Sequence, residues 1–198
     1  MGEEDLEARV WRALIGRPHV RSVELVGSRA TGTPSPLSDW DFVIGTDEYE
    51  AVARDLPSAV AELEPIAQQW DRISDHPCYM LMLRGPVKVD LIFPGELYAS
   101  LPPWTVSART LDGIDQHVWD WLLWLASKAE KGEDELVRRE LAKMFDHLLG
   151  PMGAEGLPGS LLEAARTYRT LRDRREREFA VSVTRVRERE VLPVLANA

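Results

Sequence analysis

The chain has 198 residues, of which 24 are Lys or Arg and 33 are Asp or Glu, so its formal net charge is −9 at pH 7. This length fits one domain or a compact pair of domains. The 44% of apolar residues, with seven Trp, can bury a core and exclude a mainly disordered chain. Because nucleic acids require a positively charged surface, the acidic balance also argues against a nucleic-acid partner.

Cysteine content and hydropathy argue against disulfide-bonded, zinc-binding, secreted and membrane-spanning proteins. The single cysteine, Cys78, cannot form an internal disulfide, and no Cys/His cluster has the spacing of a zinc site. The first residues are acidic, unlike a signal peptide. The longest apolar stretch, residues 118–126, contains Asp120 and is far shorter than the ~20 residues of a membrane span. We therefore expect a cytoplasmic protein without a membrane partner.

The first half of the chain carries sequence patterns of both helices and strands. Helical spacing of apolar residues predicts helices over residues 3–15 and 47–69, the latter with two prolines that break or kink it. Alternation and short apolar runs predict strands over residues 20–26, 39–44, 79–83 and 87–93. Residues 31–38, rich in Gly, Pro, Ser and Thr, form a loop between the first two strands.

The second half of the chain is helical in pattern throughout. After a loop over residues 94–103, three helices are predicted, over residues 112–131, 133–149 and 161–191. Strands gathered first and helices later indicate an α+β fold, not alternating βαβ units. We predict a strand-rich domain over residues 1–103 and a helical domain over residues 104–198.

Three carboxylates in the strand-rich half point to a metal site. Asp39 and Asp41 fall on one face of a strand, and Asp90 lies in an otherwise apolar strand, where a charge needs a partner. If these strands are neighbours, the three side chains converge and repel one another unless a cation sits between them. Oxygen-only ligands suit Mg²⁺, and shared carboxylates can hold two ions about 3.5–4 Å apart.

Basic and small residues beside these carboxylates suit a polyphosphate. Gly27 lets a phosphate approach the backbone, whose amides can bind its oxygens together with the Ser28 hydroxyl. Arg29 adds a positive charge there, or alternatively braces a carboxylate. Lys88 shares the face of Asp90 and either contacts a phosphate or neutralises the carboxylates. A purely structural reading, with an ordinary turn and a capping Asp39, leaves Asp90 unexplained.

The motif Gly27-Ser28-Arg29-Ala30-Thr31-Gly32, the Asp39-Trp40-Asp41 segment that begins ten residues after Ser28, and the later strand with Asp90 together resemble a known family. They are similar to the nucleotidyltransferase superfamily typified by DNA polymerase β, and more narrowly to its small bacterial branch of aminoglycoside and lincosamide nucleotidyltransferases. The resemblance covers residues 21–93. It implies a short mixed sheet backed by helices and followed by a helical bundle.

The resemblance also implies an activity, the transfer of a nucleoside monophosphate from a nucleoside triphosphate to an acceptor with release of pyrophosphate. Gly27 and Ser28 would bind the triphosphate, Asp39 and Asp41 would ligate two Mg²⁺ ions, and Asp90 would complete the metal site and help to activate the acceptor hydroxyl. We expect ATP as donor and a small, aminoglycoside-like hydroxyl compound as acceptor. Homodimers occur in the family.

Two alternatives stay open from the sequence. The acceptor could be a hydroxyl of a protein partner, as in toxin–antitoxin systems. The chain could also be a non-catalytic nucleotide-binding module, although all three carboxylates are present.

Two features of the helical half each allow two interpretations. His117, Asp120 and Trp124 share one helix face, which could line an acceptor pocket or pack as buried core. The last predicted helix is rich in arginine. That composition indicates a solvated, salt-bridged face, or one that complements the acidic N-terminal helix.

Overall fold

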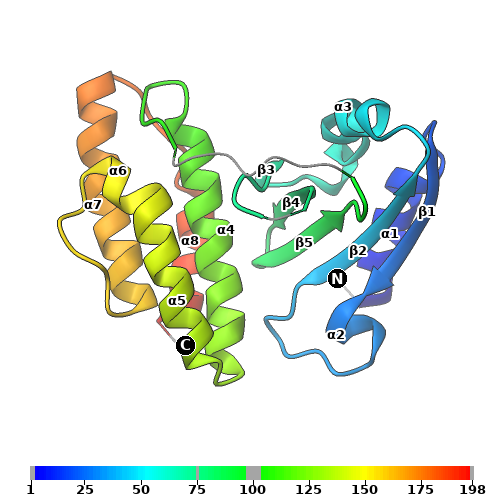
Figure 1. Ribbon diagram of the computed structural model, residues 1–198, viewed down its shortest axis with the longest axis horizontal. Helices are drawn as coiled ribbons and strands as arrows, with labels where there is room; N and C mark the ends of the chain where they lie inside the picture. The colour runs from blue at the N-terminus through cyan, green and yellow to red at the C-terminus, as the bar shows by residue number, and fades with distance from the viewer. Residues whose placement is uncertain (1–2, 75, 97–103, 197–198) are drawn as a thin grey trace. The chain divides into compact units, whose positions relative to one another are not determined.

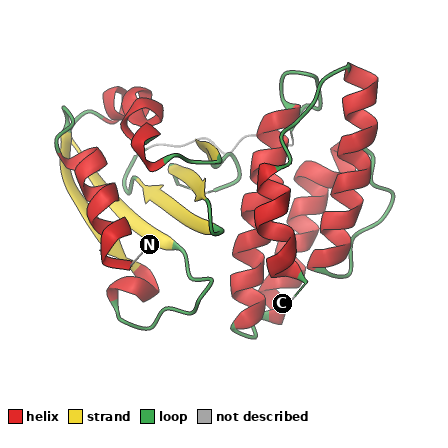
Figure 2. Cartoon of the chain, turned by 180° about the vertical axis from the view of Figure 1, so that it is seen from behind, coloured by secondary structure: helices red, strands yellow, loops and turns green. Residues whose placement is uncertain are grey.

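The computed structural model describes residues 3–74, 76–96 and 104–196. The chain divides into two compact units, Met1–Ser100 and Leu101–Ala198. Figures 1 and 2 show the first as sheet and helices and the second as helices. The predicted loop over residues 94–103 lies mostly outside the described residues.

The first unit is built on a five-stranded sheet with the strand order β1-β2-β5-β4-β3. Its strands are β1 (Val20–Val26), β2 (Trp40–Thr46), β3 (Ala67–Trp70), β4 (Cys78–Leu83) and β5 (Val87–Ile92). Only the β2–β5 pair is parallel, so the sheet is mixed. Its helices are α1 (Glu3–Ile15), α2 (Gly27–Ala30), α3 (Tyr49–Ala59) and the 3-10 turn η1 (Ala61–Leu63). The predicted α+β fold with a short mixed sheet is confirmed.

One face of this sheet forms the core of the unit. Apolar side chains from every second position of the strands pack there with residues of α1 and α3, among them Val10, Trp40, Phe42, Ile44, Leu56, Leu81, Val89 and Leu91. Because side chains alternate across a strand, the residues between them point to the opposite face. Asp41 and Asp90 therefore lie on that opposite face, away from this core.

The predicted helix over residues 47–69 is wrong in its last third. The α3 helix ends at Ala59, and after η1 the backbone turns at Glu64, which has a left-handed φ of 55°. Glu64 precedes Pro65, and a residue before proline avoids the helical conformation. The chain then enters β3, which pairs with β4 at the edge of the sheet.

The second unit is a helical bundle around one central helix. Its elements are α4 (Leu111–Glu130), α5 (Asp134–Met144), the π-helical turn η2 (Phe145–Leu149), α6 (Gly150–Met152), α7 (Leu161–Phe179) and α8 (Val186–Leu195). The α4 helix packs against α5, α7 and α8, which explains why most of its residues are buried. Within the described part of the chain, the helices are too short or too polar to cross a membrane.

The predicted single helix over residues 161–191 is two helices. The first, α7, ends at Phe179. The next residue, Ala180, has a left-handed φ of 52°, and α8 begins only at Val186. The Glu176 carboxylate accepts hydrogen bonds from the Val183 amide at 2.6 Å and from Arg185 at 2.5 Å. These bonds fold the connecting segment back on the end of α7, so the helix cannot continue.

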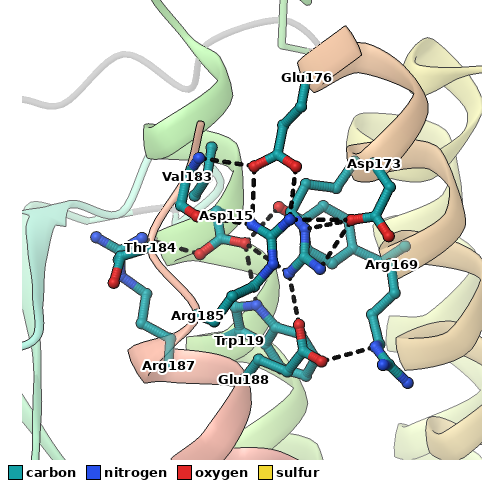
Figure 3. Close-up of polar contacts among 12 residues, drawn as sticks. Asp115, Trp119, Arg169, Asp173, Glu176, Val183, Thr184, Arg185, Arg187 and Glu188 are labelled. Atoms are coloured by element: carbon teal, nitrogen blue, oxygen red, sulfur yellow. Dashed lines mark hydrogen bonds and ion pairs between the residues drawn. The ribbon is translucent and has the colours of Figure 1, made fainter. Parts of the chain in front are cut away.

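The predicted solvated arginine face is also wrong for two residues. Arg172 and Arg187 are buried, with 2% and 5% of their surfaces exposed. Asp115, fully buried in α4, accepts hydrogen bonds from the Tyr168 hydroxyl at 2.7 Å, from the Trp119 indole at 3.1 Å and from Arg187 at 2.8 Å (Figure 3). The network therefore joins α4, α7 and α8 through buried charges.

The Glu176 interaction predicts an acid-sensitive contribution to stability. The hydrogen bond from Arg185 lowers the pKa of Glu176 to about 2 from its usual value near 4.5. A lowered pKa stabilises the folded state above the unfolded-state value, and this contribution is lost as the pH falls through the folded value. Allowing for the partial exposure of the pair, we expect about 2 kcal/mol to disappear between pH 4.5 and 2.

Urea unfolding of the wild type and of Glu176→Gln across this pH range measures the contribution. The Glu176→Gln variant should be less stable at neutral pH and should lose less stability on acidification. Glu178→Gln is the matched control, because Glu178 lies in the same helix and is half exposed. Parallel pH profiles for the wild type and Glu176→Gln would contradict the assignment.

Candidate active site

The structure brings three carboxylates together on the face of the sheet opposite the α1–α3 core. In the parallel β2–β5 pair, Asp41 lies directly opposite Asp90, while Asp39 lies just before β2. One carboxylate oxygen from each of the three residues lies within 4.8 Å of the others. Within the described part of the chain this is the one group of three such side chains that could hold a metal ion. Its all-oxygen donor set fits Mg²⁺.

The turn after β1 lies against this cluster. Gly27 has a left-handed φ of 72°, and a Cβ atom at this position would come within 2.6 Å of Asp41 Oδ2. Val26 pairs with Asp41 in the antiparallel β1–β2 ladder, which brings the turn beside that carboxylate. Gly27 and Ser28, the expected triphosphate-binding residues, are therefore next to the candidate metal ligands.

We predict that Gly27→Ala reduces nucleotidyl transfer about 100-fold, because Asp41 must move to make room and displacements near 1 Å at a reacting centre have effects of this size. Gly32→Ala is a matched control, since Gly32 has the same φ of 72° but a Cβ atom there meets nothing within 4 Å. Both variants should lose stability from the backbone strain. Steady-state turnover and thermal unfolding separate the two effects, and equal turnover of the variants would contradict the prediction.

The Asp90 carboxylate has an unusual electrostatic environment. Burial raises the pKa of Asp90 above its usual range, the neighbouring charges of Asp39 and Asp71 add to the increase, and Lys88 opposes it. The Lys88 ammonium contacts Asp90 directly and is itself buried. This contact fits a Lys88 that neutralises the carboxylates, and contact of Lys88 with a phosphate stays a prediction.

Sequence reasoning missed Asp71. Its Oδ1 atom accepts hydrogen bonds from the Ile73 and Ser74 amides, at 2.8 and 3.2 Å, just beyond β3. Asp71 was not predicted as a site residue, because the predicted helix over residues 47–69 left no strand before it. A strand prediction for residues 67–70 would have placed Asp71 at the end of a strand near Asp90.

Arg29 makes several contacts with the loop that carries Asp39. Its Nε and Nη2 atoms donate to the Ser38 carbonyl at 3.1 and 2.7 Å, and Nε also donates to the Asp39 carbonyl at 3.1 Å. The guanidinium stacks on Trp40, with Cζ 4.2 Å from the ring centroid. These contacts brace two backbone carbonyls, and a contact of Arg29 with a phosphate or a carboxylate stays a prediction.

The three candidate acceptor residues lie in α4 of the second unit. His117 and Asp120 are buried, and the His117 ring contacts the edge of Trp121 at 5.5 Å between centroids. Trp124 is half-buried, with the Lys128 ammonium 5.3 Å from its ring centroid. These contacts are those of a packed helix, and a role of the three residues in acceptor binding stays a prediction.

A mixed sheet that presents an aspartate of one strand, a second from the residue just before that strand, a third from its parallel neighbour and a glycine turn beside them is typical of nucleotide-transferring enzymes. Residues 8–110 match the nucleotidyltransferase domain family, which is just over half of the chain. The chain belongs to this family and is an enzyme that transfers nucleotidyl groups.

Other comparisons add little. A solved structure, an aminoglycoside 6-adenyltransferase from Bacillus subtilis, is similar at 12% sequence identity over 98% of each chain, with a TM-score of 0.35. A TM-score of this size does not establish a shared overall fold. No curated protein matches the sequence.

Proposed function

We propose that this enzyme uses Mg²⁺ and ATP to transfer AMP to a hydroxyl group of a small acceptor, with release of pyrophosphate. The observation that carries the proposal is the convergence of Asp39, Asp41 and Asp90 beside the Gly27-Ser28 turn. A surface-exposed acidic cluster alone would be common. Here the carboxylates stand next to a glycine turn whose backbone lies close to Asp41, which supports binding of a polyphosphate beside the metal ligands.

In this proposal the acceptor oxygen attacks the α-phosphorus of ATP, and the bond from that phosphorus to the bridging oxygen of pyrophosphate breaks. Asp39, Asp41 and Asp90 would hold the metal ions, which neutralise phosphate charge and acidify the acceptor hydroxyl when bound. Gly27 and Ser28 would orient the triphosphate through backbone amides and the hydroxyl. Asp90 would also take up the proton that leaves the acceptor hydroxyl.

The negative net charge of the chain supports a small, cationic acceptor. A chain with a net charge of −9 repels a long polyanion such as RNA, but attracts amine-bearing compounds. We therefore propose a small hydroxyl compound, with cationic aminoglycosides as the first candidates.

A label-transfer screen tests both the reaction and the acceptor. The enzyme is incubated with Mg²⁺ and ATP or GTP labelled at the α-phosphate, against aminoglycosides, lincosamides and a protein extract. We expect labelled small-molecule products from the wild type and none from Asp39→Ala or Asp41→Ala. Label on protein would favour a protein acceptor, and transfer that survives both substitutions would refute the mechanism.

A further inference from the structure

We propose that Arg29 is a positioning residue, which fixes the backbone of residues 38–39 and so sets the affinity of the carboxylate cluster for divalent metal. The proposal rests on the metal-dependent function proposed above. It assigns to Arg29 a structural action on Asp39 and Asp41 in place of a contact with the triphosphate.

Asp39 needs such support because it lies outside the sheet ladder. The β2 strand and its pairing with β1 and β5 fix Asp41, but Asp39 precedes the strand at the end of the loop over residues 31–38. This loop has turn-like bonds, such as the Ser38 amide to the Ser35 carbonyl at 3.0 Å. No strand partner is available to define where the Asp39 carboxylate points among the residues that the structure describes.

Arg29 supplies the missing constraint from the other side of the site. It belongs to α2, the short helix that begins with Gly27, and its charge-assisted bonds to the carbonyls of Ser38 and Asp39 link the two segments directly. These bonds fix the distance between the Gly27-Ser28 turn, which is expected to bind phosphate, and the loop that carries Asp39. A shift of the loop would move Asp39 relative to Asp41.

The geometry requires arginine specifically. The planar guanidinium uses two nitrogen atoms on one carbonyl while its face covers the Trp40 ring, and an ammonium group cannot do both. Trp40 is only 5% exposed and belongs to the core on the opposite face of the sheet. Through Trp40, the position of Arg29 is tied to the rigid part of the unit.

The test compares Arg29→Lys and Arg29→Gln with the wild type in Mn²⁺ binding, measured by electron paramagnetic resonance without nucleotide. We expect both variants to bind Mn²⁺ about 10- to 100-fold more weakly, as observed when residues that orient metal ligands are removed. In turnover assays kcat should fall while KM for ATP changes little. Arg54→Lys is the matched control, because Arg54 is exposed on α3.

Asp41→Asn serves as the reference that locates the Mn²⁺ site. Equal Mn²⁺ affinity of the wild type and Arg29→Lys, or an increase confined to KM for ATP, would overturn the positioning role and favour a phosphate ligand. If Arg29→Gln does not fold, the charge-conserving Arg29→Lys decides the question. Wild-type Mn²⁺ binding that is weakened in Arg29→Lys, without transfer to any acceptor, would overturn the proposed function but support the positioning role.

Discussion

Asp41→Asn is expected to slow nucleotidyl transfer by about 1000-fold, equivalent to about 4 kcal/mol of transition-state stabilisation. Asp41 has the central position among the three carboxylates, since it lies opposite Asp90 in the ladder and in contact range of the Gly27 turn. An amide at this position cannot supply the charge that a divalent cation requires. Steady-state kcat with saturating Mg²⁺ and ATP measures the loss.

The same substitution should leave the fold intact and raise the melting temperature of the metal-free protein. Three convergent carboxylates repel one another, so removing one negative charge should stabilise the folded state while it slows the reaction. Glu62→Gln, which neutralises an exposed carboxylate of the same unit, is the control for net charge. A large loss of activity accompanied by a lower melting temperature would indicate damage to the fold instead.

The sequence predicted most of the sheet because its strands carry simple signals. Alternation located β1 and β2, and two apolar runs around a Gly-Pro turn located β4 and β5. The edge strand β3 was missed because Ala67–Trp70 is short and follows a helical pattern without a break in apolar spacing. Its position depends on pairing with β4, a contact between segments that local periodicity does not reveal.

The sequence identified the residues of the candidate site, but not the contacts that they make. Motif spacing selected Asp39, Asp41 and Asp90, and the register of β2 with β5 brings them together. The bonds from Arg29 to the Ser38 and Asp39 carbonyls could not be predicted, because backbone carbonyls have no sequence signature. The direction of a long side chain depends on the loop conformation, which only the folded structure defines.

In the helical unit, the apolar spacing of the helices indicated the buried charges. The high arginine content favoured a solvent-exposed face instead. Arg172 is four residues from Tyr168 and seven from Ala165, which places it on the apolar face of α7. Asp115 likewise falls among buried apolar residues of α4. A charge at an apolar position predicts a buried ion pair. The abundance of arginine around Arg172 instead favoured a solvated surface.

These buried charges lead to the largest stability effect that we expect. Asp115→Ala should lower the free energy of unfolding of the helical unit by about 3–5 kcal/mol, the usual cost of leaving a buried ionic partner without its counter-charge. The substitution removes the acceptor of the Tyr168 hydroxyl, the Trp119 indole and one Arg187 bond at once. Urea unfolding followed by far-UV circular dichroism measures the change.

Two further variants separate charge from hydrogen bonding. Asp115→Asn keeps an oxygen for Tyr168 and Trp119 but places no charge against Arg187, so its loss should be intermediate. Glu130→Ala, an exposed acidic residue at the end of the same helix, should change stability by less than about 0.5 kcal/mol. If Asp115→Asn is as unstable as Asp115→Ala, the charge dominates. If Asp115→Asn is as stable as the wild type, the hydrogen bonds to Tyr168 and Trp119 hold α4 and α7 together without the charge.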